Sequence, residues 1–336
     1  MQALKRRFLT GVLLGVAVIS VVVVFSDREA LLDAASSFDR RLLPLILGLT
    51  LMNYLLRFLK WQYYLDRVNV HDLDTRTSGL IFASGFSMAM TPGKVGEFLK
   101  SLLIRTRTGT PMTRTLPVVF AERLTDGLSM VILSTVGLLA FRVGWPLFIL
   151  MSAVLAAILI FIQRESLVES LLGRLGDTRF LQGRIDEVRE LYRSTRTLLR
   201  PRPLAAMAAL SSISWFFECL VLYVILIGLG FDHSWNLLLA STFVFATSAW
   251  LGGASLLPGG LGATEASAAA LLVVTVDDPA MTGTVAAAAT LILRFATLWF
   301  GVAVGLAALA VTARWLGDGV AIDQAIDEDP ASAGLT

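Results

Sequence analysis

Residues 90–97 read M-T-P-G-K-V-G-E, and residues 256–265 read L-L-P-G-G-L-G-A-T-E. Both stretches contain the pattern P-G-x-x-G, interrupt a hydrophobic segment and reach a glutamate. An arginine in another hydrophobic segment follows each glutamate 26 to 29 residues later, Arg123 in the first case and Arg294 in the second. Helix breaks and charges are costly in lipid unless they line a cavity. When they occur at corresponding places in two halves of a chain, they indicate a transporter's binding site.

The composition is that of a helical membrane protein. Of the 336 residues, 56% are hydrophobic and 16% are charged, and the mean hydropathy is +0.73. Soluble proteins contain roughly 25% charged residues. The single cysteine, Cys219, excludes an intramolecular disulfide, and the two histidines, His71 and His233, lie far apart. Because a zinc site needs three or four suitably spaced ligands, we expect neither a metal site nor a cofactor.

Six hydrophobic segments are long enough to cross a bilayer, which takes about 20 apolar residues. We expect full spans at residues 8–25, 42–59, 115–141, 145–162, 204–230 and 281–312. The competing interpretation of the first segment is a signal peptide, but no convincing small-residue cleavage site follows it. At the end of the second span, Lys60, Trp61, Tyr63 and Tyr64 are typical of the membrane interface.

The two P-G-x-x-G copies lie in segments that we interpret as re-entrant hairpins of two half-helices. The first covers residues 78–105 and the second residues 237–276. The predicted breaks are Pro92-Gly93 in the first hairpin, and Gly252-Gly253 and Pro258-Gly259-Gly260 in the second. The fold class is therefore an all-α polytopic membrane protein. The unit of span, hairpin and span over residues 42–141 recurs inverted over residues 204–312.

The distribution of positive charge predicts the orientation. If both hairpins return to the side they enter, the internal segments hold about 20 Lys and Arg and the external segments hold four. The positive-inside rule then places both termini in the cytoplasm, with the protein in the cell's inner membrane. Counting each hairpin as two crossings leaves the termini unchanged. We expect an integral domain over residues 1–317 and, because residues 318–336 carry five acids and no Lys or Arg, a disordered acidic tail.

The long polar connection, residues 163–203, is expected in the cytoplasm. It contains nine arginines and six acids. Five apolar residues fall at helical spacing: Leu181, Ile185, Val188, Tyr192 and Leu199. This pattern is typical of an amphipathic helix on the membrane surface, and a solvated connecting helix fits it equally well.

Eight charged side chains fall within hydrophobic segments: Arg57, Glu97, Glu122, Arg123, Asp126, Glu218, Glu265 and Arg294. An Arg or Asp at the centre of an inserted helix costs roughly 2.5 to 3.5 kcal/mol, so most of the eight must be paired or hydrated. Structural ion pairs are one interpretation of the set, and a functional polar cavity is the other. Their arrangement around two broken hairpins favours the cavity.

The hairpin tips have the chemistry of an anion site. Thr91 can cap a helix whose first residue is Pro92, and the free N–H groups of such a helix end bind phosphate or carboxylate. The candidate substrate-binding residues are Thr91, Pro92, Gly93, Gly96, Glu97, Glu122, Arg123, Asp126, Glu218, Pro258, Gly259, Gly260, Gly262, Glu265 and Arg294. A shared site requires Glu97 and Arg123 to lie close to Glu265 and Arg294.

Four stretches carry a family resemblance: Pro92–Glu97, Lys100, Glu122–Gly127 and Leu257–Glu265. With them the chain resembles the lysylphosphatidylglycerol synthase transmembrane (flippase-like) family over nearly its whole length. The resemblance implies an integral membrane protein that translocates lipids or lipid-linked molecules. In the two-domain synthases a soluble aminoacyl-transferase domain follows the membrane part. Here the sequence ends about 20 residues after the last predicted span, so lysyl transfer is not expected.

The expected function is transbilayer translocation, as a flippase or scramblase, of an anionic phospholipid or lipid-linked precursor. In this hypothesis Arg123 and Arg294 bind the phosphate while the carboxylates orient them or load protons. The sequence lacks the G-x-x-x-x-G-K-[ST] pattern of direct ATP use and the G-x-S-x-G pattern of hydrolases, so we do not expect an enzyme. A membrane-embedded lipid-modifying enzyme and an accessory subunit of a lipid or glycan pathway are the alternatives. The expected partner is a membrane lipid rather than nucleic acid, and self-association stays open.

Overall fold

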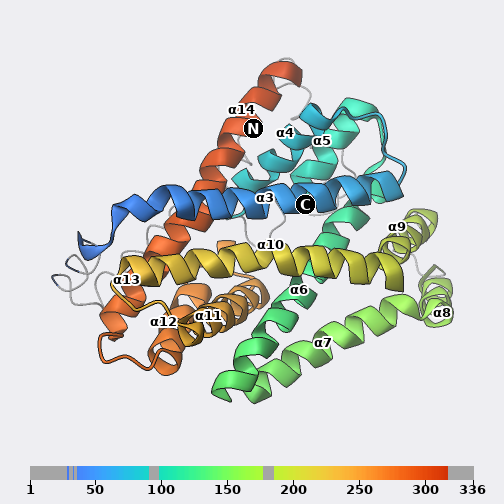
Figure 1. Ribbon diagram of the computed structural model, residues 1–336. Helices are drawn as coiled ribbons and strands as arrows, with labels where there is room; N and C mark the ends of the chain where they lie inside the picture. The colour runs from blue at the N-terminus through green and yellow to red at the C-terminus, as the bar shows by residue number, and fades with distance from the viewer. Residues whose placement is uncertain (1–28, 30–32, 34–35, 91–97, 177–184, 317–336) are drawn as a thin grey trace, which may run out of the picture.

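The computed structural model describes residues 36–90, 98–176 and 185–316, together with Glu29 and Asp33 (Figure 1). The described chain is helical throughout and contains no strand. The protein is an all-α, multi-pass membrane protein. The first predicted span, residues 8–25, and the predicted acidic tail, residues 318–336, lie outside the described residues.

The helices follow one another in a simple order along the chain. They are η1 (Arg40–Leu42), α3 (Leu43–Arg67), α4 (Thr75–Ser84), η2 (Gly85–Met88), α5 (Phe98–Thr108), α6 (Met112–Phe141), α7 (Trp145–Gln163), α8 (Glu165–Gly176), α9 (Ile185–Leu198), α10 (Pro201–Gly228), α11 (Trp235–Ala254), η4 (Pro258–Gly260), α12 (Ala263–Thr275), α13 (Gly283–Arg294), η5 (Phe295–Trp299) and α14 (Phe300–Leu316).

Six helical segments of the described chain are long and apolar enough to span a membrane: Arg40–Arg67, Met112–Phe141, Trp145–Gln163, Pro201–Gly228, Trp235–Ala254 and Gly283–Thr312. All except α11 coincide with expected spans. We expected a half-helix broken at Gly252-Gly253 there, but α11 continues to Ala254. A Cβ at Gly252 would collide with the hydroxyl of Thr264 on α12. Gly252 therefore allows close helix packing and does not break the helix.

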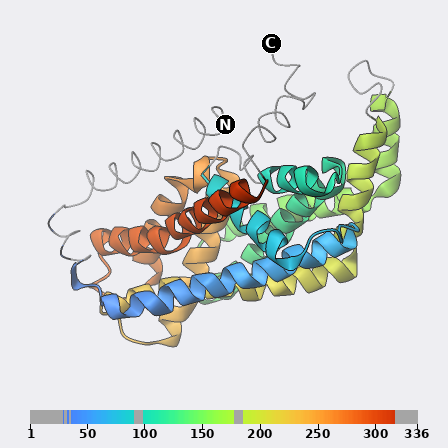
Figure 2. The same ribbon diagram turned by 90° about the horizontal axis from the view of Figure 1, so that it is seen from above.

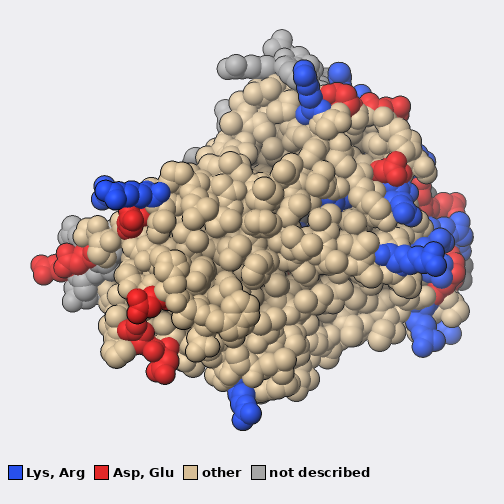
Figure 3. Space-filling view, viewed as in Figure 1, with Lys and Arg blue, Asp and Glu red and all other residues tan. Residues whose placement is uncertain are grey.

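The outer surface of the bundle matches a lipid environment. α7 buries only Met151 and Leu155 and exposes many large apolar side chains. Figure 3 shows a broad face almost free of charge, with most Lys, Arg, Asp and Glu gathered towards its ends. Extended apolar surfaces of this kind mark contact with a membrane.

Two apolar clusters mark the two ends of the bundle, and they show where each hairpin opens. The first joins the end of α3, the end of α5, the start of α6 and the end of α9, through Val68, Leu103, Val118 and Leu198 among others. The second joins the end of α10, the start of α11, the end of α12 and the start of α13, through Leu226, Leu237, Leu272 and Ala286 among others. The α4–α5 hairpin and the α11–α12 hairpin therefore enter the bundle from opposite ends.

The two long helices α3 and α10 pack against each other along the bundle. α3 and α10 run side by side in opposite directions (Figures 1 and 2). α14 packs across α4 and η2. A Cβ at Gly305 of α14 would collide with the backbone of Ser87, so this glycine permits the close approach to η2, whereas a Cβ at Gly301 would collide with the Tyr54 hydroxyl of α3.

The polar connection forms two short helices, α8 and α9, that pack on each other. Tyr192 of α9 is buried against Val168 and Leu172 of α8, and Ile185 and Val188 pack on the same cluster. The Tyr192 hydroxyl donates a 3.0 Å hydrogen bond to the carbonyl oxygen of Ile162 at the end of α7. The apolar side of α9 is thus covered by protein, which favours the connecting helix over the membrane-surface helix. Leu181 lies outside the described residues.

Candidate functional site

The second P-G-x-x-G copy lies inside the bundle, beside the residues that precede the first break. Met90, the last described residue before the first break, is buried against Leu261 in the second copy and Val302 of α14. A Cβ at Gly259 would lie 3.7 Å from the carbonyl oxygen of Ala89. Five predicted site residues of the first copy lie outside the described residues: Thr91, Pro92, Gly93, Gly96 and Glu97.

Backbone conformation explains the glycines at the second tip. Gly259, Gly260 and Gly262 have φ angles of 59°, 67° and 84°, a region that side chains with a Cβ rarely adopt. Space is also short, because a Cβ at Gly260 would lie 3.0 Å from the Cα of Gly252. Pro258 opens the short helix η4 and is buried. The sequence P-G-G-L-G therefore folds into a tight corner that presents backbone to the bundle interior.

Glu265 and Arg294 fix this corner. The Arg294 Nε lies 2.7 Å from Glu265 Oε1, and Arg294 Nη2 donates a 2.6 Å hydrogen bond to the carbonyl oxygen of Gly259. The other carboxylate oxygen of Glu265 accepts a 2.7 Å hydrogen bond from the Gly262 N–H. The hairpin tips were expected to offer free N–H groups to phosphate. In the structure the protein's own carboxylate takes the N–H of Gly262 at this helix end.

A cavity lies between the second tip and the segment formed by η2 and Ala89. Its lining comes from α3, α4, η2, α5, α6, α10, α11, η4, α12, α13, η5 and α14, and its empty volume is about 1160 Å³ including the open mouth. The basic side chains in the lining are Arg57, Lys100, Arg123 and Arg294. Three of the four belong to segments long enough to span a membrane: Arg57 to Arg40–Arg67, Arg123 to Met112–Phe141 and Arg294 to Gly283–Thr312. The cavity therefore concentrates positive charge inside the apolar bundle.

Among the described residues that line this cavity, Glu218 of α10 is the one carboxylate. Its exposed fraction is 2%, and its Oε2 has no hydrogen-bond partner. Among the described ion pairs none includes Glu218. An isolated charge in such a place is costly, so this group differs from every paired carboxylate of the bundle.

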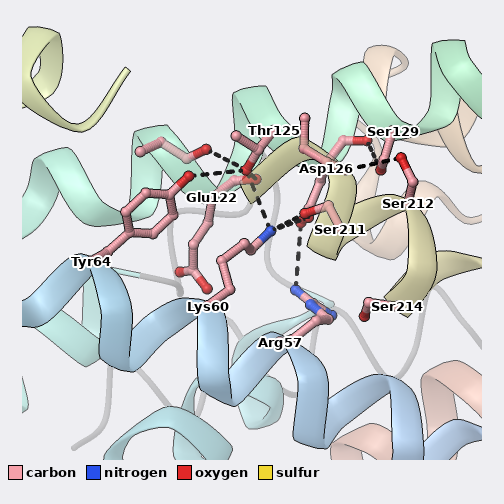
Figure 4. A network of polar contacts seen from close by, with 12 residues as sticks. Arg57, Lys60, Tyr64, Glu122, Thr125, Asp126, Ser129, Ser211, Ser212 and Ser214 are labelled. Carbon is pink, nitrogen blue, oxygen red and sulfur yellow. Dashed lines mark hydrogen bonds and ion pairs between the residues drawn. The ribbon is translucent and has the colours of Figure 1, made fainter. Parts of the chain in front are cut away.

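Next to the cavity lies a closed set of polar side chains, here named the Lys60 cluster: Lys60, Tyr64, Thr125, Asp126 and Ser211 (Figure 4). Lys60 Nζ lies 2.5 Å from Asp126 Oδ1 and donates a hydrogen bond of 2.6 Å to the Ser211 hydroxyl. The Ser211 hydroxyl in turn donates to Asp126 at 3.1 Å. The cluster thus joins α3, α6 and α10 through one ion pair and the hydrogen bonds of Ser211.

The expectation that Lys60, Trp61 and Tyr64 lie at the membrane interface is wrong. Lys60 is 1% exposed, and both Trp61 and Tyr64 are fully buried. The physical reason is that α3 continues to Arg67, so Lys60 lies two turns inside the helix end. The carboxylate that Lys60 requires comes from α6, a partner that no local pattern on α3 indicates.

A second pair, Lys100 with Glu122, completes the buried charges near the cavity. Lys100 Nζ lies 2.5 Å from Glu122 Oε2 and 4.4 Å from the ring centroid of Trp61. Neither Lys60 nor Lys100 was among the candidate site residues. Lys100 could have been recognised from the sequence, because it follows the first break closely and is one of the residues that carry the family resemblance.

Arg57 connects the cavity with the Lys60 cluster. Its Nη2 lies 3.8 Å from Asp126 Oδ2, and its guanidinium carbon lies 5.0 Å from the ring centroid of Trp215. Elsewhere in the cavity lining, Arg294 is followed directly by the π-helical turn η5. The Tyr54 hydroxyl donates a 2.8 Å hydrogen bond to the carbonyl oxygen of Thr297 in this turn. Turns of this type occur frequently at functional sites.

The structure sorts the described candidate residues into three groups. The cavity lining contains Arg123, Glu218, Gly259, Gly260 and Arg294. The second tip is held by Pro258, Gly262 and Glu265. Glu122 and Asp126 instead form ion pairs beside the cavity. In the described part of the chain, no group of three or more His, Cys, Asp or Glu could hold a metal ion.

Two comparisons with known proteins identify the family. A family model described as the lysylphosphatidylglycerol synthase TM region matches residues 12–305. A curated UPF0104 membrane protein from Methanothermobacter thermautotrophicus is 25% identical over 325 residues, which cover 91% of this chain and 93% of that protein. This chain belongs to the family of the lysylphosphatidylglycerol synthase TM region.

Proposed function

We propose that this protein translocates an anionic phospholipid, or a lipid-linked precursor with an anionic headgroup, between the leaflets of a membrane. The observation that carries the proposal is the basic cavity beside the second hairpin tip. Three arginines line it, namely Arg57, Arg123 and Arg294. Family membership supports a role in lipid-related membrane biology.

The chemistry of the cavity suits a phosphate diester headgroup. Guanidinium groups bind phosphate oxygens through forked N–H donors, and the attraction is stronger in a low-dielectric interior than in water. The acyl chains would stay in the surrounding lipid, because the outer faces of helices such as α7 are apolar.

The two hairpins supply a route for alternating access. Because they enter from opposite ends, a small displacement of either tip would open the same cavity towards a different leaflet. Met90 and Leu261 form the apolar contact between the tips. In the proposed cycle this contact parts on one side at a time while the headgroup stays near the arginines.

The positions of Lys and Arg at the ends of the bundle support an orientation of the protein in the membrane. Lys and Arg gather at the end formed by α8 and α9 (Figure 3). By the positive-inside rule we propose that this end faces the cytoplasm of a cell's inner membrane. The α4–α5 hairpin would then open to the cytoplasmic leaflet and the α11–α12 hairpin to the outer leaflet.

Reconstituted vesicles test the proposal. The full chain is placed in phosphatidylcholine vesicles that contain a trace of fluorescent phosphatidylglycerol, and a membrane-impermeant reductant reports how fast labelled lipid reaches the outer leaflet. We expect exchange well above that of protein-free vesicles, with the lipid mass unchanged. Exchange equal to that of empty vesicles for several anionic lipids contradicts the proposal, and a changed lipid mass indicates an enzyme instead.

A further inference from the structure

Glu218 stands apart from the other buried carboxylates of the described chain. Glu122, Asp126 and Glu265 each have a cationic nitrogen within 2.5 to 2.7 Å. Glu218 has no such partner, is equally buried, and has an Oε2 without a hydrogen-bond partner in the lining of the cavity. A carboxylate that is buried without a partner takes up a proton readily, because the neutral form avoids the cost of the buried charge.

The helices around α10 determine which charges act on Glu218. α3, α6, α11, α13 and η1 pack against α10. α11 contains no titratable residue, and Arg40 and Arg41 of η1 are exposed at the far end of α10. The titratable and charged groups that the other three helices place towards α10 are Tyr54, Arg57, Lys60, Arg123, Asp126 and Arg294.

Occupation of the cavity would change this balance. Lys60 and Asp126 neutralise each other, so the positive field at Glu218 comes from the arginines of the cavity. A phosphate bound to these arginines would cancel that field and add a negative charge nearby. Both effects favour the neutral form of a neighbouring carboxyl group.

We propose that Glu218 is a proton-binding site of the cavity, which takes up a proton from water when an anionic headgroup binds and releases it when the headgroup leaves. The proton binds a carboxylate oxygen of Glu218, and no other bond forms or breaks. This inference rests on the proposed function for the nature of the anion. It makes translocation of an anionic lipid a proton-coupled process.

Binding measurements on the full chain in detergent test the linkage. The probe is dihexanoyl phosphatidylglycerol, a soluble phosphate diester whose charge is constant between pH 5 and 9. For the wild type, affinity should fall as pH rises, by up to about tenfold per pH unit where one proton is linked to binding. Glu218→Gln, which imitates the neutral carboxyl, should bind as tightly as the wild type at pH 5 and show no such dependence.

A matched control separates this group from other carboxylates. Glu187→Gln changes an exposed residue of α9 and should keep the wild-type pH dependence. A Glu218→Gln variant that keeps the wild-type dependence overturns the proposal, and so does a wild type whose affinity is constant from pH 5 to 9.

A second measurement avoids the Glu218 variant, in case it folds poorly. Dicyclohexylcarbodiimide reacts with protonated carboxyl groups in apolar surroundings, and mass spectrometry locates the adduct. In a Cys219→Ser background, which removes the neighbouring thiol, we expect labelling of Glu218 at pH 5 that decreases towards pH 9, and none at Glu122 or Glu265. Absence of labelling at Glu218 at pH 5 overturns the proposal.

Vesicle exchange then separates the two proposals. If lipid exchange is fast but equally fast from pH 5 to 9 and in Glu218→Gln, the proton site is wrong and translocation stands. If the probe binds with the expected pH dependence but no lipid exchanges, the proton site stands and the proposed translocation is wrong.

Discussion

The Lys60 cluster and the cavity lie side by side in the same apolar bundle, yet their charges are used in opposite ways. In the cluster, Lys60 and Asp126 meet at 2.5 Å, and the Ser211 hydroxyl donates a hydrogen bond to the same carboxylate oxygen. In the cavity, Arg123 and Arg294 share the lining with Glu218, whose Oε2 has no hydrogen-bond partner. Arg57 touches both regions. The buried carboxylates of the described chain therefore divide into Glu122, Asp126 and Glu265, each with a cationic nitrogen within 2.7 Å, and Glu218, which has none that close.

Removing one partner from the Lys60 cluster should have the largest effect. Lys60→Met leaves Asp126 buried without its main counter-charge, which costs about 3 to 5 kcal/mol for broken buried pairs. We expect little folded protein, measured by size-exclusion chromatography and thermal unfolding in detergent. Lys60→Met combined with Asp126→Leu should recover most of the stability. Normal stability of the single variant would show that the cluster does not join the helices.

Closing the space at Gly305 should have the next largest effect, and it should change the cavity while leaving the Lys60 cluster intact. Gly305→Ala forces α14 away from η2, which supplies Phe86 to the cavity wall, at about 1 to 3 kcal/mol for overpacking. Gly48→Ala is the matched control, because a Cβ at Gly48 meets nothing within 4 Å. Equal melting temperatures of the two variants in detergent would contradict the close approach of α14 and η2.

A change of cation at the cavity should alter transport more than stability. Arg294→Lys keeps a positive partner for Glu265 but loses the forked geometry that also reaches Gly259. We expect folded protein with lipid exchange about tenfold slower, equivalent to about 1.4 kcal/mol. Arg107→Lys, at an exposed position of α5, is the control. Unchanged exchange in Arg294→Lys would remove this residue from the proposed headgroup site.

The smallest effect is expected where charges meet in water. Arg196 and Glu165 form a 2.7 Å ion pair between α9 and α8, but both side chains are partly exposed. Exposed pairs contribute about 0 to 1 kcal/mol. Arg196→Gln should therefore leave the unfolding temperature and lipid exchange nearly unchanged. A loss as large as that of Lys60→Met would erase the distinction between buried and exposed pairs in this molecule.

Much of the fold was predictable from local pattern. Long hydrophobic segments of the sequence predicted the spans over α6, α7 and α10. Interrupted hydrophobic segments predicted the two hairpins. Where prediction was wrong, tertiary contacts decided: α11 continues past its glycines because they pack on α12, and α3 continues past Lys60 because α6 supplies Asp126. A local pattern contains no information about such partners.

The candidate site was predictable only in part, because local pattern identifies charges and helix breaks but not their partners. Arg123, Glu218 and Arg294 were recognisable as charges inside apolar segments, and the glycines of the second tip as helix breaks. Their separation into cavity lining and ion pairs was not recognisable, because neighbours such as Glu122 and Arg123 point to different sides of α6. Substrate binding by these residues stays a prediction.

By itself, the sequence determined that this chain is a helical membrane protein with two broken hairpins and costly intramembrane charges, because hydrophobic length, helix breaks and charge are local properties. Only the tertiary structure decided which charges are paired. Lys60 and Lys100 take the carboxylates of α6, and Arg294 takes that of α12. Among the described residues Glu218 forms no ion pair, because the partners of a buried charge depend on what other helices bring within a few ångströms.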